Sequence, residues 1–521
     1  MRPIVSLPAR NCLRVAQRSF GRCKYAAQPA ALRWSSSEAR QWTTPLAKQL
    51  SEAITATGPI PLAAFMRMCL TSDLGGYYMS KQEGRDQFGQ RGDFITSPEI
   101  SQIFGELIAV WFVAEWMGQG RKRRGVELIE IGPGRGTLMD DMLRTIKNFE
   151  PMAQSIEAVY LVEASPALRD AQKQLLCGDA PMEETSIGHR SISKYAGIPV
   201  IWTENIRFVP SGKRPLSQVP FAILTFTDHD KTPFIVAHEF FDALPIHAFQ
   251  SIAPSDSAQE SIQTPTGVHK LSPEAIKNGQ KKGPQWREMV VSPTPPNSTH
   301  TTLHTPKSQQ AANVPPEFQL TLSKAATPHS LYLPEISPRY RALKSIPDSL
   351  IEISPESHAY AQEFARRIGG TPTEPRTASG AAIILDYGPA DSIPTNSLRG
   401  IREHKRVSPL SSPGLVDLSA DVDFVALAEA ALGASPGVEV YGPVEQGYFL
   451  LSMGIEERAK RLMGQARTEG DVEKGNRVES SWKRLVDRGG GGMGKVYKAM
   501  AIVPESGGKR RPVGFGGEVG P

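Results

Sequence analysis

A glycine-rich turn between an apolar run and an amphipathic run is the first place in this chain where chemistry is expected. The apolar residues 126–131 predict a buried strand, and Thr137 opens a helical pattern after Gly132, Gly134 and Gly136. Glycine lets a ligand approach the backbone closely, and the N-terminus of the following helix offers free N–H groups. At the C-terminal end of a parallel strand, such a turn holds a nucleotide or nucleoside. We therefore expect a nucleoside-type cofactor.

Two carboxylates stand in register with this turn. Glu130 lies two residues before Gly132, and a second apolar run ends at Glu163, 27 residues after Gly136. A carboxylate at the tip of the second strand can accept hydrogen bonds from both hydroxyls of a ribose. A dinucleotide fingerprint would place its third glycine at Thr137, so the observed spacing disfavours a dehydrogenase. The plainer alternative is a generic glycine turn followed by an ordinary strand-end glutamate.

A later apolar run, residues 234–237, predicts another buried strand that ends in reactive groups. His238, Glu239 and Asp242 follow it together with the pair Phe240–Phe241. Because parallel strands end at the same edge of a sheet, we expect this patch to face the cofactor. An arginine acceptor would suit it, since a guanidinium pairs bidentately with carboxylates and stacks on aromatic rings. The alternative is that the phenylalanines are core residues and Glu239 caps a helix.

Composition bounds the class of protein. The chain has 521 residues, of which 40% are hydrophobic, and this length predicts one large core with insertions or two lobes. No membrane span is expected, because the apolar stretch 103–117 carries Glu106 and Glu115 and predicts a buried amphipathic helix. The four cysteines form no CxxC pair, and His300 and His304 lie in a polar stretch. We therefore expect neither a disulfide framework nor a metal site.

The first 37 residues differ from the rest. They contain seven basic residues, a cluster of serines and no acidic residue before Glu38. This composition is typical of a mitochondrial transit peptide, with a cleavage point guessed near Trp34–Ser35. Without these seven, 52 of the 59 basic residues face 54 acidic ones. The basicity then serves targeting, and no nucleic-acid partner is expected. A disordered basic tail is the alternative.

Pattern and composition divide the remainder of the chain. Residues 45–70 predict two helices, and the Gly-, Tyr- and charge-rich segment 75–106 suits a site better than a core. Residues 251–316 are rich in Ser, Thr, Pro and Gln. We expect there a largely disordered, low-complexity insertion around a short strand at 285–292. Residues 504–521 predict a disordered tail.

The order of these motifs resembles a known family. The pattern E-x-G-x-G-x-G resembles motif I of class I S-adenosylmethionine (SAM) methyltransferases. From about Thr43 to Ile502, the chain resembles the MidA family through GDFITSPEISQIFGE, IEIGPGRGTLMDDMLR, LVEASPALRDAQ, AHEFFDALPIHAF, EISPES, IILDYG and PGLVDLSADVDF. The resemblance implies an α/β, Rossmann-like methyltransferase core with a helical N-terminal region and α+β additions. It also implies one methyltransferase domain, formed by residues 43–250 and 317–503.

The mitochondrial members of the MidA family are protein arginine methyltransferases that act in the assembly of respiratory complex I. The resemblance therefore implies SAM-dependent symmetric dimethylation of an arginine on the 49-kDa core subunit, in the mitochondrial matrix. By the same resemblance, SAM would contact Glu130, Gly132, Gly134, Gly136 and Glu163. The acceptor would face the segment from Glu239 to Asp242, beside His238. Whether the chain forms a homodimer stays open.

Two other functions remain in view. One is a small-molecule methyltransferase, because motif I alone does not specify the acceptor. The other is an assembly chaperone that keeps the fold without catalysis. The intact glycine turn, with Glu130 and Glu163 beside it, disfavours the chaperone.

Overall fold

The structure, a computed structural model, is described for most of the chain after the predicted transit peptide. The described residues are 40–79, 93, 95–211, 231–253, 261–264, 266–274, 283–303, 305–310 and 314–516. The predicted transit peptide, residues 1–37, and its cleavage point lie outside these ranges. So do parts of the segment 75–106.

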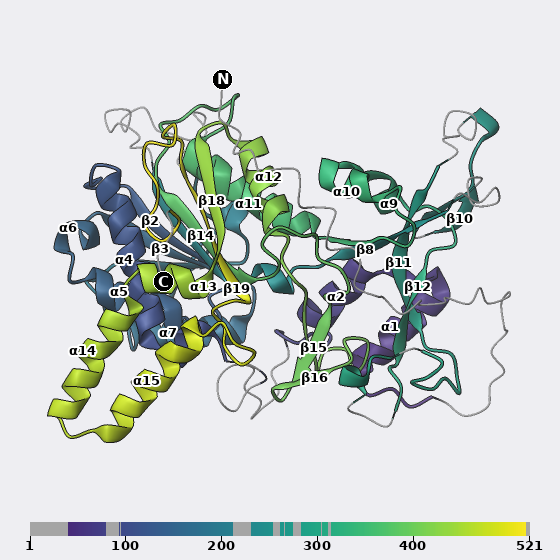
Figure 1. Ribbon diagram of the computed structural model, residues 1–521, viewed down its shortest axis with the longest axis horizontal. Coiled ribbons are helices and arrows are strands. Elements are labelled where there is room, and N and C mark those ends of the chain that lie inside the picture. Colours follow the sequence, from purple (N-terminus) through teal and green to yellow (C-terminus); the bar gives the residue numbers. More distant parts are fainter. Residues whose placement is uncertain are drawn as a thin grey trace.

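A large, mostly parallel sheet forms the centre of one lobe (Figure 1). Among the described residues, nine strands join it in the order β18 (Val438–Glu445), β19 (Tyr497–Pro504), β14 (Ala381–Tyr387), β7 (Thr232–His238), β2 (Val126–Ile131), β3 (Ile156–Val162), β6 (Pro199–Thr203), β5 (Gly188–Ile192) and β4 (Glu183–Thr185). The strands from β14 to β6 run parallel. Every residue of β2 and β7 is buried, as expected for parallel strands covered on both faces.

Helices cover both faces of this sheet. One face packs against α4 (Gln102–Gly118), α5 (Thr137–Ile146), α7 (Pro166–Cys177), α13 (Gln446–Ser452), α14 (Ile455–Thr468) and α15 (Val472–Val486). The other packs against α11 (Pro355–Gly369) and α12 (Phe424–Ala434). The short α3 (Ser97–Ile100) and α6 (Glu150–Ala153) flank the first group. This doubly wound arrangement confirms the predicted Rossmann-like core.

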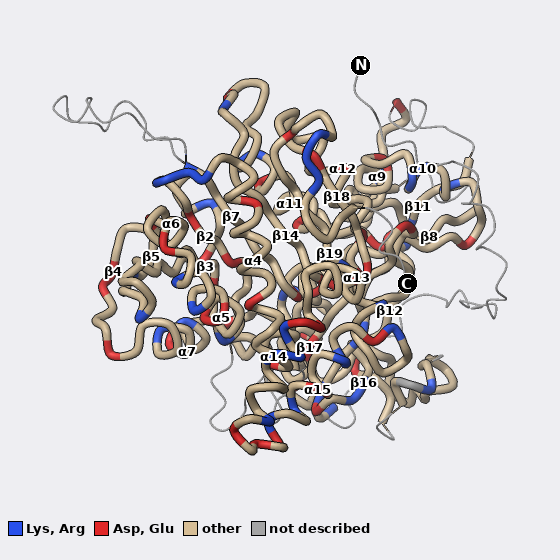
Figure 2. The backbone as a smooth tube through the Cα atoms, turned by 60° about the vertical axis from the view of Figure 1, so that its left-hand side comes forward, with Lys and Arg blue, Asp and Glu red and all other residues tan. Residues whose placement is uncertain are grey.

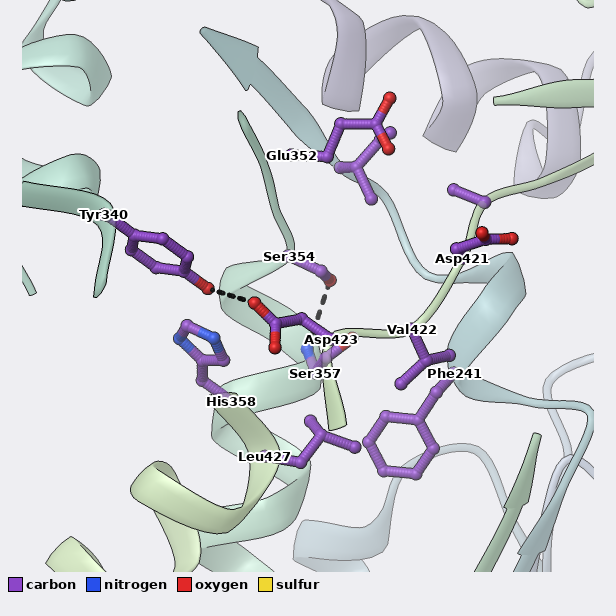
Figure 3. A pocket seen from close by; sticks show the side chains of 12 residues that line it. Phe241, Tyr340, Glu352, Ser354, Ser357, His358, Asp421, Val422, Asp423 and Leu427 are labelled. Carbon is purple, nitrogen blue, oxygen red and sulfur yellow. Dashed lines mark hydrogen bonds between the residues drawn. The ribbon is translucent and has the colours of Figure 1, made fainter. Parts of the chain in front are cut away.

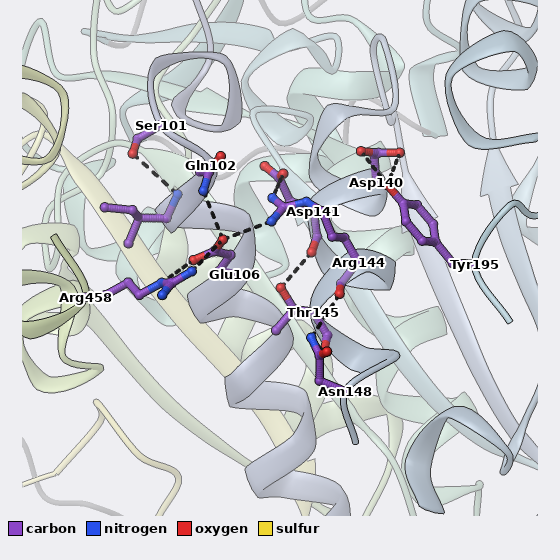
Figure 4. A network of polar contacts seen from close by, with 11 residues as sticks. Ser101, Gln102, Glu106, Asp140, Asp141, Arg144, Thr145, Asn148, Tyr195 and Arg458 are labelled. Atoms are coloured by element: carbon purple, nitrogen blue, oxygen red, sulfur yellow. Dashed lines mark hydrogen bonds and ion pairs between the residues drawn. The ribbon is translucent and has the colours of Figure 1, made fainter. Parts of the chain in front are cut away.

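A buried ion-pair network ties three of these helices together (Figure 4). Glu106 on α4 is buried, and its carboxylate oxygens lie 3.0 Å from Arg144 on α5 and 2.7 Å from Arg458 on α14. Glu115, also buried on α4, lies 2.7 Å from Arg510. A buried carboxylate is costly without a partner, so the pairs explain how a helix with two acidic residues packs inside the molecule.

A second lobe is built around a smaller antiparallel sheet, on the right of Figure 1. Its described strands are β1 (Ile60–Pro61), β11 (Gln285–Pro293), β8 (His247–Ile252) and β13 (Leu350–Ile353), and β12 (Phe318–Leu322) also pairs with β11. The sheet packs against α1 (Pro45–Thr57) and α2 (Leu62–Thr71) in a separate apolar cluster. α9 (Pro328–Tyr332), the 3₁₀ turn η7 (Leu333–Glu335) and α10 (Pro338–Leu343) flank it on another side.

The remaining elements are small. One hairpin joins β9 (Ser261–Thr264) to β10 (Gly267–Lys270), and another small sheet contains β16 (Lys405–Val407), β15 (Arg399–Arg402) and β17 (Asp417–Ser419). Single 3₁₀ turns are η1 (Ile206–Phe208), η4 (Phe241–Ala243) and η6 (Lys307–Gln309).

The structure corrects the expectation for residues 251–316. The expected short strand is the nine-residue β11, and it is bonded to β8, β12 and β1 in the middle of the second sheet. Met289 and Val291 on this strand are buried against α1 and α2. β11 therefore belongs to the core of the second lobe, whereas most of the other described residues of this range are exposed or half-buried. The polar composition of the range as a whole hid the central place of this strand in a sheet.

The expected disordered tail also needs correction, because residues 505–516 pack onto the first lobe. Phe515 is 7% exposed and its ring lies 5.4 Å from Phe449 and 6.2 Å from Trp111. The indole N–H of Trp111 donates a hydrogen bond to the carbonyl of Val513 at 3.1 Å. The tail thus covers Trp111 on α4.

Charges of both signs are mixed over the surface (Figure 2). On the α14–α15 hairpin they form exposed pairs one helical turn apart, such as Lys460–Glu456 and Lys483–Glu479. Among the described helices, none combines the length and the apolar character that crossing a bilayer requires.

Replacing Phe515 by alanine tests the packing of the tail. We expect Phe515→Ala to lower the free energy of unfolding by about 3 kcal/mol, because a buried aromatic ring is lost and a cavity is left. Val513→Ala is the matched control, since Val513 is exposed and its backbone carbonyl is kept. Urea unfolding followed by tryptophan fluorescence gives both values. Equal midpoints for Phe515→Ala and the wild type would contradict the assignment of the tail to the core.

Candidate functional site

A cavity of about 290 Å³ opens at the C-terminal ends of β2, β3 and β7. The chain runs outward from β2 through β3 to β6 and returns to β7 on the other side of β2, so the cavity lies where the strand order reverses. Ligands of open α/β sheets bind at this point. Its size is close to the lower end of the range of about 300–1,000 Å³ that is usual for ligand pockets.

The glycine turn forms one wall of the cavity. Gly132, Gly134 and Gly136 have φ angles of +64°, +52° and +85°, a region that residues with a Cβ rarely adopt. A Cβ at Gly132 would lie 2.7 Å from the ring of Phe240. Gly136 is the N-cap of α5, so the first N–H groups of that helix point toward the turn.

Glu163 follows the end of β3 and lines the same cavity. One carboxylate oxygen accepts the N–H of Ser165 at 2.8 Å, and the other lies 3.3 Å from the side-chain amide of Gln172. Burial raises the pKa of Glu163 to about 7. The carboxylate therefore stands at the junction of the second strand and α7, where the sequence predicted it.

Gln172 links the two parts of this wall, and no sequence motif pointed to it. Its amide N–H₂ also donates to the carbonyl of Gly134 at 2.6 Å, and its amide oxygen accepts the indole N–H of Trp202 at 2.9 Å. The side chain is fully buried. It thereby fixes the distance between the glycine turn and Glu163.

Glu130, the last residue but one of β2, also lines the cavity. It is buried, and its Oε2 atom has no hydrogen-bond partner within the described part of the chain. Burial, and after it the nearby Glu163, raises the pKa of Glu130 well above its ordinary value. A buried acceptor without a partner is costly, so this oxygen fits a ligand that brings hydrogen-bond donors.

His238 and Glu239 enter the cavity from the end of β7. Glu239 has a φ angle of +48°, which is strained for a residue with a side chain. Its Oε1 atom is buried without a hydrogen-bond partner among the described residues, although His238 Nε2 lies 3.3 Å away. Burial raises the pKa of Glu239 well above its ordinary value and lowers that of His238 to about 3. The imidazole is therefore neutral.

Asp386, at the end of β14, holds this strained turn in place. Its Oδ2 atom accepts three backbone N–H groups in a row, from Phe240 at 3.1 Å, Phe241 at 2.9 Å and Asp242 at 3.3 Å. Three backbone donors on one buried carboxylate oxygen fix the conformation of the residues that follow Glu239. From the sequence, Asp386 was visible only as a polar residue at a strand end.

Asp242 does not line the cavity, contrary to the expectation from the sequence. Its carboxylate accepts the hydroxyl of Tyr387, and its backbone carbonyl accepts the N–H of Ala420 at 2.9 Å. From the η4 turn, this side chain therefore contacts Tyr387 at the end of β14. Of the two phenylalanines, Phe241 is in the core and Phe240 lines the cavity, as the sequence reading allowed.

Other residues of the cavity come from distant segments. Glu99 and Arg135 lie 3.5 Å apart at its edge, and Tyr360 on α11 packs edge-on against Phe240 at 4.9 Å. Tyr78 also lines it and donates to Asp417 at 3.0 Å. The segment 75–106 was expected to serve a site, and its residues Tyr78 and Glu99 line this cavity. Tyr360 had no such signal.

A much smaller enclosed cavity, of about 20 Å³, lies beside α11 and α12 (Figure 3). Tyr340 donates a hydrogen bond to Asp423 across it at 3.0 Å, and Ser354 caps α11 at its edge. This space is sufficient for about one water molecule. It is therefore a feature of the scaffold, and the larger cavity is the candidate site.

Comparison with known proteins agrees with this geometry. The family model described as "Putative S-adenosyl-L-methionine-dependent methyltransferase" matches residues 107–444. The rat "Protein arginine methyltransferase NDUFAF7, mitochondrial" is 34% identical over 466 residues, which are 88% of this chain and 85% of the relative. The human protein of that name is 33% identical over 81% of this chain and 76% of its own length. A Drosophila melanogaster homologue is 33% identical over 90% and 87%.

Solved structures agree on the fold. A crystal structure of a Burkholderia thailandensis protein bound to S-adenosyl-homocysteine superposes with a TM-score of 0.59 at 20% identity, over 90% of this chain and 94% of that one. A native crystal structure from the same organism gives a TM-score of 0.55 at 18% identity, over the same shares. The chain therefore belongs to the MidA-like family of SAM-dependent methyltransferases, and SAM is its cofactor.

Proposed function

We propose that this chain methylates an arginine side chain of a protein. The observation that carries the proposal is Glu239, a buried carboxylate with an unpartnered oxygen in the cavity that the glycine turn also lines. A guanidinium can meet such a carboxylate with two parallel N–H donors. The curated relatives bear the name protein arginine methyltransferase, which supports the same acceptor.

The cofactor is assigned to the wall formed by the glycine turn and the two carboxylates near it. Gly132, Gly134 and Gly136 lack side chains, so the ligand can approach the backbone closely. The carboxylate of Glu163 would accept hydrogen bonds from both ribose hydroxyls. Glu130 has a free buried oxygen for a further donor of the ligand. The acceptor oxygens and the open glycine backbone therefore fit a nucleoside with a cationic amino-acid arm. When bound, SAM supplies the methyl group on its sulfonium.

The charge of the cavity favours a cationic acceptor. Its lining glutamates are Glu99, Glu130, Glu163, Glu204 and Glu239, and among the described lining residues the only Lys or Arg is Arg135. Arg135 lies against Glu99, and Glu204 lies 3.3 Å from Arg169. The remaining glutamates, Glu130, Glu163 and Glu239, have no such arginine partner within the part of the chain that the structure describes and can balance the positive charge of bound ligands.

Glu239 would orient the guanidinium and stabilise its charge. Because burial favours the protonated carboxyl, a cation beside it restores the ionised form. His238 is neutral and does not repel that cation. Phe240 and Tyr360 offer ring surfaces for its planar face. The strained turn keeps Glu239 aimed at one position, which serves alignment of the acceptor nitrogen.

We further assign the acceptor protein and the compartment. The relatives are named mitochondrial, and residues 1–37 have the composition of a transit peptide. On this basis, with the MidA resemblance, the chain acts in the mitochondrial matrix by symmetric dimethylation of an arginine on the 49-kDa subunit of complex I. A homodimer is compatible with this function and is not required by it.

Gly134→Val tests the cofactor wall. We expect loss of measurable SAM binding by isothermal titration calorimetry, because the side chain would enter the cavity and valine strongly disfavours a positive φ angle. Gly197→Val is the matched control. Gly197 also has a positive φ angle, +67°, but is exposed in a loop with no atom within 4 Å of its Cβ position. Normal SAM affinity in Gly134→Val would refute the cofactor assignment.

The same pair of variants tests the acceptor in cells. Mass spectrometry of the 49-kDa subunit should find the dimethylarginine with the wild type and Gly197→Val, and not with Gly134→Val. If the modification persists while complex I assembly still requires the protein, the chaperone function replaces the proposed one. If purified protein methylates small molecules but no subunit peptide, the small-molecule activity replaces it.

The pH dependence of SAM binding tests Glu163. Its pKa is raised to about 7, and only the ionised form accepts both hydroxyl hydrogen bonds. Affinity should therefore fall as pH drops through 7, and a single group of this pKa gives about eightfold weaker binding at pH 6 than at pH 7.5. Glu163→Gln should bind SAM weakly with little pH dependence. A wild-type affinity that does not change over this interval would contradict the role of Glu163.

Glu239→Gln tests the acceptor side. We expect SAM affinity within about twofold of the wild type and a fall in kcat of about 100-fold or more, since the charge facing the acceptor is lost while size is kept. Glu204→Gln, at the exposed mouth of the cavity, is the control and should retain activity. Turnover of a subunit peptide gives kcat. Undiminished turnover in Glu239→Gln would place the acceptor elsewhere.

A further inference from the structure

A cluster of metal-ligating side chains lies in the second lobe, outside the SAM cavity. It consists of His247 at the start of β8, Glu288 in β11 and His329 on α9. One ligand atom from each residue lies within 4.8 Å of the others. None of the three residues lines the SAM cavity.

No sequence motif indicates this cluster, because Glu288 lies 41 positions after His247 and His329 lies another 41 positions after Glu288. Pairing of β11 with β8 and the position of α9 above β11 bring them together. The expectation that the chain binds no metal rested on the absence of ligands at close spacing in the sequence. Such a search does not detect ligands that are far apart in the sequence and close in the fold.

The ligand atoms lie close to one another. His247 Nδ1 lies 2.7 Å from Glu288 Oε1, and His329 Nδ1 lies 3.4 Å from Glu288 Oε2. Glu288 is fully buried, and its other contact is the hydroxyl of Thr327, which donates to Oε2. Such an outer hydrogen bond orients a ligating carboxylate.

His329 supplies the third ligand atom, at the edge of the cluster. His329 Nδ1 is buried and has no hydrogen-bond partner of good geometry within the described residues. The ring itself is partly exposed, so an ion has a path to the cluster.

We propose that His247, Glu288 and His329 bind one zinc ion. Two imidazoles and a carboxylate are a known zinc donor set, with a fourth position for water. Zinc would take the place of the proton between His247 and Glu288, with small shifts of the side chains to ligand distances of about 2.0–2.2 Å. The ion would tie β8, β11 and α9 together. The site lies outside the SAM cavity and is independent of the proposed methyl transfer.

The test uses full-length, tag-free protein, because a polyhistidine tag binds zinc itself. The protein is stripped with a chelator, dialysed and titrated with Zn²⁺, and bound metal is measured by equilibrium dialysis with mass-spectrometric detection of zinc. We expect one equivalent per chain and a higher melting temperature with zinc. Co²⁺ in place of Zn²⁺ should give the visible absorption of a low-coordinate nitrogen and oxygen site.

Variants locate the ion. His329→Ala, at a partly exposed position, should fold and bind zinc more than about 100-fold more weakly, since loss even of an outer partner costs 10–100-fold. Glu288→Gln keeps the size of the buried side chain and should lose binding as well. His269→Ala is the control, because it removes an exposed histidine of β10 that lies outside the cluster.

Two results would overturn the proposal. One is that stripped wild-type protein takes up no more zinc than His329→Ala. The other is that His269→Ala loses the ion as completely as His329→Ala does. In the first case the three residues form a hydrogen-bonded ion-pair cluster that needs no metal. SAM binding is measured in parallel, and its retention in His329→Ala separates this site from the methyl-transfer site.

Discussion

The site depends on one buried interaction, the acceptance of three successive backbone N–H groups by Asp386. Together with the hydrogen bond from the Glu239 N–H to the carbonyl of Leu385, it holds Glu239 at a positive φ angle, a conformation that costs of order 1–3 kcal/mol. Asp386 belongs to β14, whereas the turn follows β7, so the parallel pairing of these strands sets the position of the carboxylate. Local strain at the site is thus supported by the register of the central sheet.

The same region gathers buried carboxyl groups. Burial raises the pKa values of Glu130, Glu163 and Glu239 at the cavity, and of Asp242 and Asp417 behind it. Several ionised carboxylates close together in a buried site are electrostatically unfavourable. Protonation of the carboxylates removes this cost, and binding of a cationic ligand also removes it. The cavity therefore favours positively charged ligands over neutral or anionic ones.

The sequence was sufficient where the chemistry is local to a strand end. Glu130 lies near the end of β2, and Gly132, Gly136 and Glu163 follow strands that periodicity identifies. The topology of a parallel sheet brings such ends to one edge. The sequence was not sufficient to predict the direction in which a side chain points. Asp242 is three residues from Glu239, yet the η4 turn directs it to Tyr387. No local pattern encodes that turn, because the hydrogen bonds that fix it come from a strand more than 140 residues away.

The second lobe shows how composition misleads when a strand is short and its neighbours are polar. β11 buries six successive residues, 286–291, but the average over 251–316 is dominated by Ser, Thr, Pro and Gln. Its stability comes from pairing with β8, β12 and β1, strands scattered from Ile60 to Leu322. Such contacts have no signature within a sequence window. The lobe that the window average concealed also places Tyr78 and Met79, from the segment after α2, against the SAM cavity, so its fold bears directly on which acceptors can enter.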